Sequence, residues 1–196
     1  RWRQRLSDVQ QQAQQQFLEN HHYQVHTDFR GKSWLLQDHR YYAKAALAEL
    51  PPVAQAWMAL YGEQNIRLVA TAITSWVQAI PYQDLADVRT SPATGYVSPV
   101  ELLFANQGDC DSKAVLWASV MKLIFPKMDI NIIYFDDHAI IAARIPAIRD
   151  EQTLDYKTMQ LLLIDPTGPA QRPMGQLTDH YRRKIINREF IQQPLF

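Results

Sequence analysis

The feature that most constrains the fold is a long apolar segment at residues 114–125, which reads AVLWASVMKLIF. Its apolar side chains cover nearly every side of a helix, whereas a helix on a protein surface keeps a polar face. Such a helix has to be enclosed by other elements, so we expect it to form the centre of the core. With 196 residues, of which 47% are hydrophobic, the chain is large enough to enclose it within one globular domain.

A polar turn, NQGD at residues 106–109, leads into this helix. Asp109 is a good N-cap, because its side chain accepts hydrogen bonds from free N–H groups of the first turn. The only cysteine, Cys110, follows directly, where free N–H groups and the helix dipole favour a thiolate and a lowered pKa. The negative charges of Asp109 and Asp111 oppose ionisation of the thiol, unless they cap backbone amides or pair with Lys113.

The remaining segments predict an α+β fold with an N-terminal helical region. Apolar runs after the buried helix predict strands, which cover residues 129–136, 138–145 and 159–165. Helical spacing that ends at proline or glycine predicts helices at residues 39–50, 53–62, 64–80 and 99–106. Residues 1–20 suit a helix but are also rich in glutamine, as a low-complexity segment is. A hairpin with Gly31 in its turn is expected at residues 23–38. Residues 81–98 are expected to form a loop.

Two residues at strand ends complete a set with the thiol. A nucleophilic thiol needs a base, and the base needs a group that orients it. His138 opens the second predicted strand and Asp165 closes the third, and these ends lie at the same edge of an antiparallel sheet. We therefore expect Cys110, His138 and Asp165 to converge, with the imidazole taking the thiol proton and the carboxylate holding the imidazole.

These residues also carry a family resemblance. The segments QGDCDSKAVL, DDHAIIAARI and LLLIDPTG, together with WVQAIPYQD and GYVSP upstream, resemble the bacterial transglutaminase-like superfamily of thiol enzymes over roughly residues 65–168. The resemblance implies a nucleophile helix packed on an antiparallel sheet, in an arrangement related to papain. It also implies Cys110 as nucleophile, His138 as base and Asp165 as orienting acid.

The resemblance further divides the chain. We expect residues 1–60 to form an N-terminal helix, hairpin and helical region packed on a transglutaminase-like catalytic core at residues 61–196. The two parts are expected to form one compact domain overall. The chain begins at Arg1, so we expect an excised or processed piece that a signal peptide or membrane anchor could precede.

An acyl-transfer site also needs donors for the oxyanion. The backbone N–H of Cys110 is the natural first donor, because it points out of the helix start. Tyr82, Tyr96 and Gln107 are candidates for the second, and Tyr82 ranks first because IPY belongs to the resemblance. Asp109 is expected to support the site as the helix cap.

Several classes of function are disfavoured. The 20 basic and 20 acidic residues balance, so nucleic acid is not an expected partner, and the basic run at 180–189 is interpreted as a solvated helix face. One cysteine excludes an intrachain disulfide and a multi-cysteine zinc module. The carboxylates of Asp109, Asp111, Asp136 and Asp137 match no metal-binding spacing, so neither a metal nor a cofactor is expected. No apolar run approaches the ~18 residues of a membrane span.

The remaining aromatic side chains are assigned structural roles. The histidines outside the triad are expected to be structural or exposed; they are His21, His22, His26, His39 and His180. Most tryptophans are expected in the core; they are Trp34, Trp57, Trp76 and Trp117, whereas Trp2 is left unassigned.

The predicted function is thiol-dependent acyl transfer on peptide or side-chain amide bonds of a peptide or protein substrate. Hydrolysis is preferred, because water needs no second binding site. Two alternatives stay open: a protein-glutamine transglutaminase, and an inactive transglutaminase-like module that binds a peptide or partner. A lone thiol leaves the compartment open, and a periplasmic or membrane-tethered bacterial domain is favoured over a cytoplasmic one.

Overall fold

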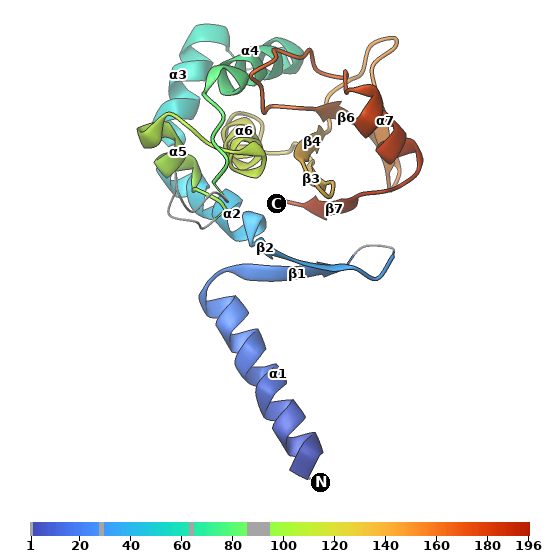
Figure 1. Ribbon diagram of the computed structural model, residues 1–196. Coiled ribbons are helices and arrows are strands. Elements are labelled where there is room, and N and C mark those ends of the chain that lie inside the picture. Colours follow the sequence, from blue (N-terminus) through green and yellow to red (C-terminus); the bar gives the residue numbers. More distant parts are fainter. Residues whose placement is uncertain (1, 28–29, 63–64, 86–94) are drawn as a thin grey trace.

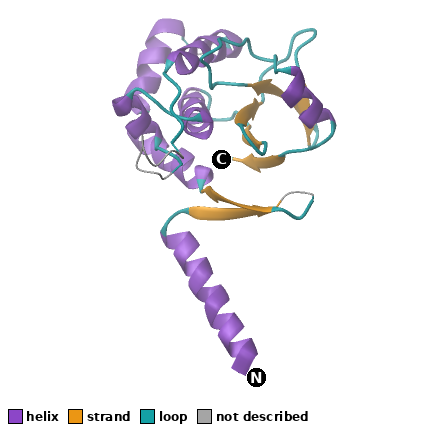
Figure 2. Cartoon of the chain, viewed as in Figure 1, coloured by secondary structure: helices purple, strands orange, loops and turns teal. Residues whose placement is uncertain are grey.

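The computed structural model describes residues 2–27, 30–62, 65–85 and 95–196. Its helices are α1 Trp2–Asn20, α2 His39–Glu49, α3 Pro51–Tyr61, α4 Ile66–Ala79, α5 Pro99–Ala105, α6 Cys110–Ile124 and α7 Asp179–Ile186. Its strands are β1 Tyr23–Thr27, β2 Ser33–Gln37, β3 Ile130–Tyr134, β4 Ala139–Ala143, β5 Thr153–Tyr156, β6 Met159–Ile164 and β7 Ile191–Pro194. Figure 1 shows their arrangement along the chain, and Figure 2 separates the helical side from the sheet.

Helix α6 occupies the centre of the core, as its apolar sequence predicts. Every residue from Ser112 to Met121 is buried. Helices α2, α3, α4 and α5 pack around α6 on one side, and strands β3 and β4 lie against it on the other (Figure 1). The enclosed Trp117 is fully buried, and its Nε1 donates a hydrogen bond of 2.9 Å to Thr74. Because α6 cannot shift without disturbing all of these neighbours, its first residue is fixed in space.

The main sheet is antiparallel and, within the described residues, has the strand order β5-β6-β4-β3-β7. Strands β3 and β4 are buried along their whole length, since α6 covers one face and a second apolar cluster, which includes Ile133, Ile140 and Leu163, packs on the other. The expected α+β class, with the nucleophile helix on an antiparallel sheet, is confirmed. The strands predicted at 129–136, 138–145 and 159–165 are confirmed as β3, β4 and β6.

Two strands of this sheet were not predicted. Strand β5 pairs with β6, and β7 pairs with β3 from Asn131↔Pro194 to Tyr134↔Ile191. The sequence of β7 is IQQP, which carries neither an apolar run nor a clear alternation and places proline at its end. Its position depends on pairing with a distant strand, so local pattern gives little indication of it.

The N-terminal segments are arranged around the hairpin. Helix α1 extends away from the rest of the molecule, and β1 and β2 lie between α1 and the body (Figure 1). The helix expected at residues 1–20 and the hairpin are both confirmed. Gly31 lies in the turn with φ +80°, a conformation that favours glycine, while residues 28–29 lie outside the described residues.

Other expectations are met in part. Of the loop predicted at 81–98, residues 86–94 lie outside the described residues. Trp117 is in the core, and Trp57 and Trp76 pack against it. The prediction for Trp34 is wrong, because this side chain is half-buried on β2 and lines a surface cavity. Trp2 is exposed.

The division of the chain at residues 60 and 61 stays a prediction. Residues of α2 and α3 belong to the same apolar cluster as α6. Among the described helices, none is long and apolar enough to cross a membrane.

Candidate active site

His138 and Asp165 meet at one edge of the sheet. His138 directly precedes β4 and Asp165 directly follows β6, and these strands are antiparallel neighbours. His138 Nε2 lies 3.2 Å from Asp165 Oδ2. Burial by itself raises the pKa of Asp165, but the hydrogen bond and charge of His138 outweigh it, so the pKa lies below the usual value of an aspartate. The carboxylate is therefore suited to hold an imidazolium.

Cys110 reaches the same edge from α6. Helix α6 packs against β4, and the backbone N–H groups of Ala139 and Asp111 act on the Cys110 thiol in the direction that lowers its pKa. Cys110, His138 and Ala139 line one cavity of about 210 Å³. The structure thus brings the thiol, the imidazole and, behind the imidazole, the Asp165 carboxylate to one end of the sheet.

The expected lowering of the thiol pKa is not found. Burial, together with the negative charges of Asp111 and Asp109, raises the pKa of Cys110 well above its usual value. Helix dipole and two N–H donors favour the thiolate, but these effects are smaller than the cost of placing an anion in a half-closed site beside carboxylates. Cys110 is consequently a protonated thiol at neutral pH.

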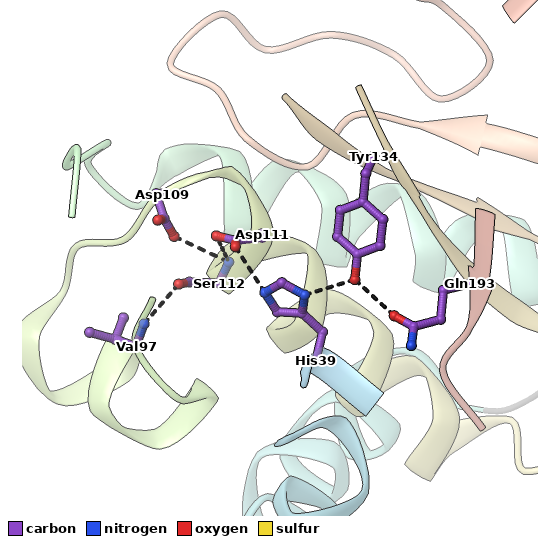
Figure 3. A network of polar contacts seen from close by, with 7 residues as sticks. All are labelled: His39, Val97, Asp109, Asp111, Ser112, Tyr134 and Gln193. Carbon is purple, nitrogen blue, oxygen red and sulfur yellow. Dashed lines mark hydrogen bonds and ion pairs between the residues drawn. The ribbon is translucent and has the colours of Figure 1, made fainter. Parts of the chain in front are cut away.

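The two aspartates beside the thiol have different roles (Figure 3). Asp109 is the N-cap of α6 and accepts a hydrogen bond from the backbone N–H of Ser112, as expected. Burial and then the charge of Asp111 raise the pKa of Asp109 to about 8, so its carboxyl group keeps a proton at neutral pH and is hydrogen-bonded to Asp111. Burial opposes ionisation of Asp111 as well, but His39 lowers its pKa below the usual value. Neither carboxylate pairs with Lys113.

A buried polar network continues from Asp111. His39 Nε2 lies 2.8 Å from Asp111 Oδ2, and His39 Nδ1 lies 2.7 Å from the hydroxyl of Tyr134. That hydroxyl donates to Oε1 of Gln193 on β7, at 3.0 Å (Figure 3). The structural role expected for His39 is confirmed, but its partners were not foreseen. The sequence around His39 does not indicate its contacts with Asp111 and Tyr134, because these residues lie far from His39 in the chain.

Lys113 links the loops on either side of the site. Its side chain is fully buried, and its ammonium group donates hydrogen bonds to the backbone carbonyls of Ile80 and Thr167. Gln78 supports the same region by donating from Nε2 to the carbonyl of Asp165, at 2.7 Å. These contacts hold the loop before Tyr82 and the loop after Asp165 against α6.

The candidate oxyanion residues occupy different places. Tyr82 lines the cavity beside Cys110, and its backbone forms a β-bridge with Gly108. Burial and then the proximity of Cys110 raise the pKa of Tyr82 to about 12, so its hydroxyl keeps its proton. Tyr96 is instead buried against His39, with ring centroids 4.9 Å apart. Neither Tyr96 nor Gln107 belongs to the lining of this cavity.

An aromatic side chain from α7 also belongs to the site. The ring of Tyr181 stacks on His138 with centroids 4.9 Å apart and on Phe135 at 4.8 Å. The basic run at 180–189 was interpreted as a solvated helix face, and α7 is indeed a helix without buried residues. The inward position of Tyr181 was missed, because one aromatic residue in a charged helix has no distinctive pattern.

The described residues contain no cluster of three or more His, Cys, Asp or Glu side chains arranged to hold a metal ion.

Comparison with known proteins gives a distant likeness in structure and no match in sequence. No family model matches the sequence, and no curated protein matches it. Among solved structures, the fold is similar to that of Legionella pneumophila LapG, with a TM-score of 0.42 and 13% sequence identity over 80% of this chain and 79% of that chain. The likeness is too distant to assign a function, which we therefore argue from the geometry of this chain.

The protonated Asp109 has a testable effect on stability. Its pKa is about 8 in the folded state against an ordinary value of 3.8, so the folded state holds a proton that the unfolded state releases. The resulting stabilisation is complete below pH ~4 and is lost as the pH rises to ~8. Asp109→Asn mimics the protonated cap, so relative to this variant the wild type should lose more than about 1 kcal/mol between pH 5 and pH 8. Urea unfolding at each pH measures the difference.

Asp8→Asn provides the control, because Asp8 is exposed on α1. It should follow the wild type at every pH. Equal pH dependence of the wild type and Asp109→Asn would show that Asp109 is ionised in the folded protein.

Proposed function

We propose that the protein is a thiol-dependent hydrolase of peptide or side-chain amide bonds, with Cys110 as nucleophile, His138 as general base and acid, and Asp165 as orienting group. The observation that carries the proposal is the His138–Asp165 contact of 3.2 Å at the end of the sheet where Cys110 opens α6. A thiol triad requires the base to lie between the thiol and the orienting group, and the proposal is supported by His138 lining the same cavity as Cys110 while it contacts Asp165.

In the proposed reaction His138 acts during the attack, since the resting thiol is protonated. Asp165 holds Nε2 of His138, which leaves Nδ1 to take the thiol proton while the sulfur bonds to the amide carbonyl carbon. The proton then passes to the amide nitrogen, the C–N bond breaks, and an acyl-thioester remains on Cys110. Water next attacks this thioester, gives a proton to His138, and releases the acid with the thiol restored.

The oxyanion formed in both steps needs two donors. We assign the backbone N–H of Cys110 as the first and the hydroxyl of Tyr82 as the second, because Tyr82 lines the cavity and keeps its proton. This choice ranks Tyr82 ahead of Tyr96 and Gln107.

The competing function is a module that binds a peptide without cleaving it. The observation that favours it is the raised pKa of Cys110, which burial and the two neighbouring aspartates cause. If His138 does not remove the proton, the thiol stays protonated and cannot act as a nucleophile.

Alkylation of Cys110 separates the two functions. Cys110 is the only cysteine, so iodoacetamide labelling between pH 5 and pH 9 reports on this thiol alone. If His138 assists ionisation, wild-type labelling at pH 7 should be at least roughly tenfold faster than labelling of His138→Ala. His21→Ala, an exposed histidine before the hairpin, is the matched control and should label like the wild type.

The hydrolase proposal fails if wild-type labelling rises only at or above ~8.5, the usual value of a free thiol, and His138→Ala behaves identically. Hydrolysis and transamidation are then distinguished by adding a biotinylated primary amine to a reacting glutamine-containing peptide. A hydrolase releases the free acid as its main product, whereas a transglutaminase incorporates the biotin.

A further inference from the structure

The N-terminal hairpin turns one face toward the proposed active site. Cross-strand pairs alternate between its faces, with Gln24↔Leu36 and His26↔Trp34 on the inner face. Gln24 accepts a hydrogen bond of 2.8 Å from Gln193 on β7, which anchors this face to the sheet. Figure 1 shows the hairpin lying next to β7. The outer residue Leu35, by contrast, is 57% exposed.

Two residues of the inner face reach the cavity of the thiol. Trp34 and Leu36 line the same space as Cys110 and His138. Aromatic and apolar side chains also line it, from Tyr82, Tyr134, Phe135 and Ala139. The acidic part of the lining comes from Asp84, Asp109, Asp111 and Asp136. The volume of about 210 Å³ lies below the ~300–1,000 Å³ of sites for drug-sized ligands. The cavity therefore has room for one apolar side chain beside the reacting bond.

The indole N–H of Trp34 is a buried hydrogen-bond donor. Its Nε1 atom is buried, and among the described residues no acceptor lies within reach of it. A buried donor without an acceptor is costly, and native proteins usually satisfy such groups. A backbone carbonyl of a bound peptide has the right chemistry to accept this bond, because tryptophan offers only a donor.

We propose that the inner face of the hairpin is the substrate-binding wall of the site, where Trp34 and Leu36 hold a large apolar side chain of a peptide and Trp34 donates to a peptide carbonyl. This inference rests on the proposed function and narrows its substrate class. The substrate is a polypeptide with a leucine-like residue next to the reacting bond. The hairpin thus belongs to the site, although it precedes the core in sequence.

Peptide-like alkylating reagents test the wall directly. The probes are the chloromethyl ketones of benzyloxycarbonyl-leucine and benzyloxycarbonyl-glycine, with iodoacetamide as a reagent too small to need the wall. The second-order rate constant for each is measured on Cys110. Burial of the leucine side chain should make the leucine ketone roughly 10- to 100-fold faster than the glycine ketone.

Variants of the hairpin then distinguish substrate binding by the wall from the reactivity of the Cys110 thiol. Trp34→Ala should reduce the leucine preference to within about threefold of unity. The preference is the ratio of the two ketone rates, so a general change in the reactivity of the thiol cancels in it. Trp34→Phe should keep most of the preference but slow both ketones, because it retains the ring and loses the N–H. The matched control Leu35→Ala lies on the outer face of the same strand and should change none of these rates.

The outcomes distinguish the two proposals. If iodoacetamide labels wild type and His138→Ala equally slowly, the proposed hydrolase fails, and the substrate wall with it. If the thiol depends on His138 but shows no leucine preference, or keeps it in Trp34→Ala, the hydrolase stands and the wall is wrong. Circular dichroism checks the fold of each variant, and should Trp34→Ala disrupt the hairpin, Leu36→Ala must lower the leucine preference instead.

Discussion

Replacing Gly168 by alanine is expected to destabilise the protein by about 3 kcal/mol or more and to slow alkylation of Cys110. Gly168 has a φ of +66°, which side chains rarely adopt, and a Cβ atom there would lie only 2.3 Å from the backbone oxygen of Gln78. That oxygen belongs to α4, so the loop after Asp165 has to move instead. Moving it disturbs the contact between Asp165 and His138.

The matched control is Gly31→Ala in the hairpin turn. Gly31 has a φ of +80°, but nothing lies within 4 Å of the added Cβ, so this variant carries the conformational cost of ~1–2 kcal/mol without the clash. Urea unfolding gives both free energies of unfolding, and iodoacetamide gives the reactivity of the thiol. Equal losses in the two variants would show that the loop accommodates a side chain at Gly168.

Replacing Lys113 by methionine should be similarly severe. Methionine fills nearly the same volume but leaves the buried carbonyls of Ile80 and Thr167 without their donor. Each unsatisfied carbonyl costs about 1–3 kcal/mol, so a total loss of roughly 2–6 kcal/mol is expected in urea unfolding. The reactivity of Cys110 should also fall, because the loops on both sides of the site lose their common anchor.

The pH dependence of this variant provides a second readout. Burial lowers the pKa of Lys113 to about 8, from an ordinary value of 10.5. Between these values the unfolded state binds a proton that the folded state has released, so wild-type stability should rise with pH across that window. Lys113→Met should lack the rise. Lys122→Met is the matched control on the same helix, and it removes one partly buried hydrogen bond, to Met128, at a cost of ~1 kcal/mol.

The parts of the fold that follow from local pattern were predictable. The apolar sequence of α6 leaves no face for solvent. Ser98 and Glu101 form a capping box at the start of α5, and Pro99 follows the cap in the first turn. The positions of His138 and Asp165 at strand ends were enough to predict their meeting, because antiparallel strands bring those ends together.

The unpredicted features depend on contacts between distant segments. His39 and Asp111, Tyr181 and His138, and the pairing of β7 with β3 each join residues that no local period relates. The pKa of Cys110 was mispredicted for a similar reason. A helix start is visible in the sequence, but the burial that outweighs its dipole is a property of the assembled site.

The hydrogen bond between Gln24 and Gln193 has a consequence for how the protein is made. Strand β7, which carries Gln193, is synthesised after the strands and helices of the core, whereas the hairpin that carries Gln24 is synthesised before them. Contacts of such long sequence separation form slowly, because much chain entropy is lost before they can form. The hairpin therefore gains this anchor only after β7 has been synthesised, so a growing chain that does not yet include β7 has the thiol but not the anchored wall of the cavity beside it.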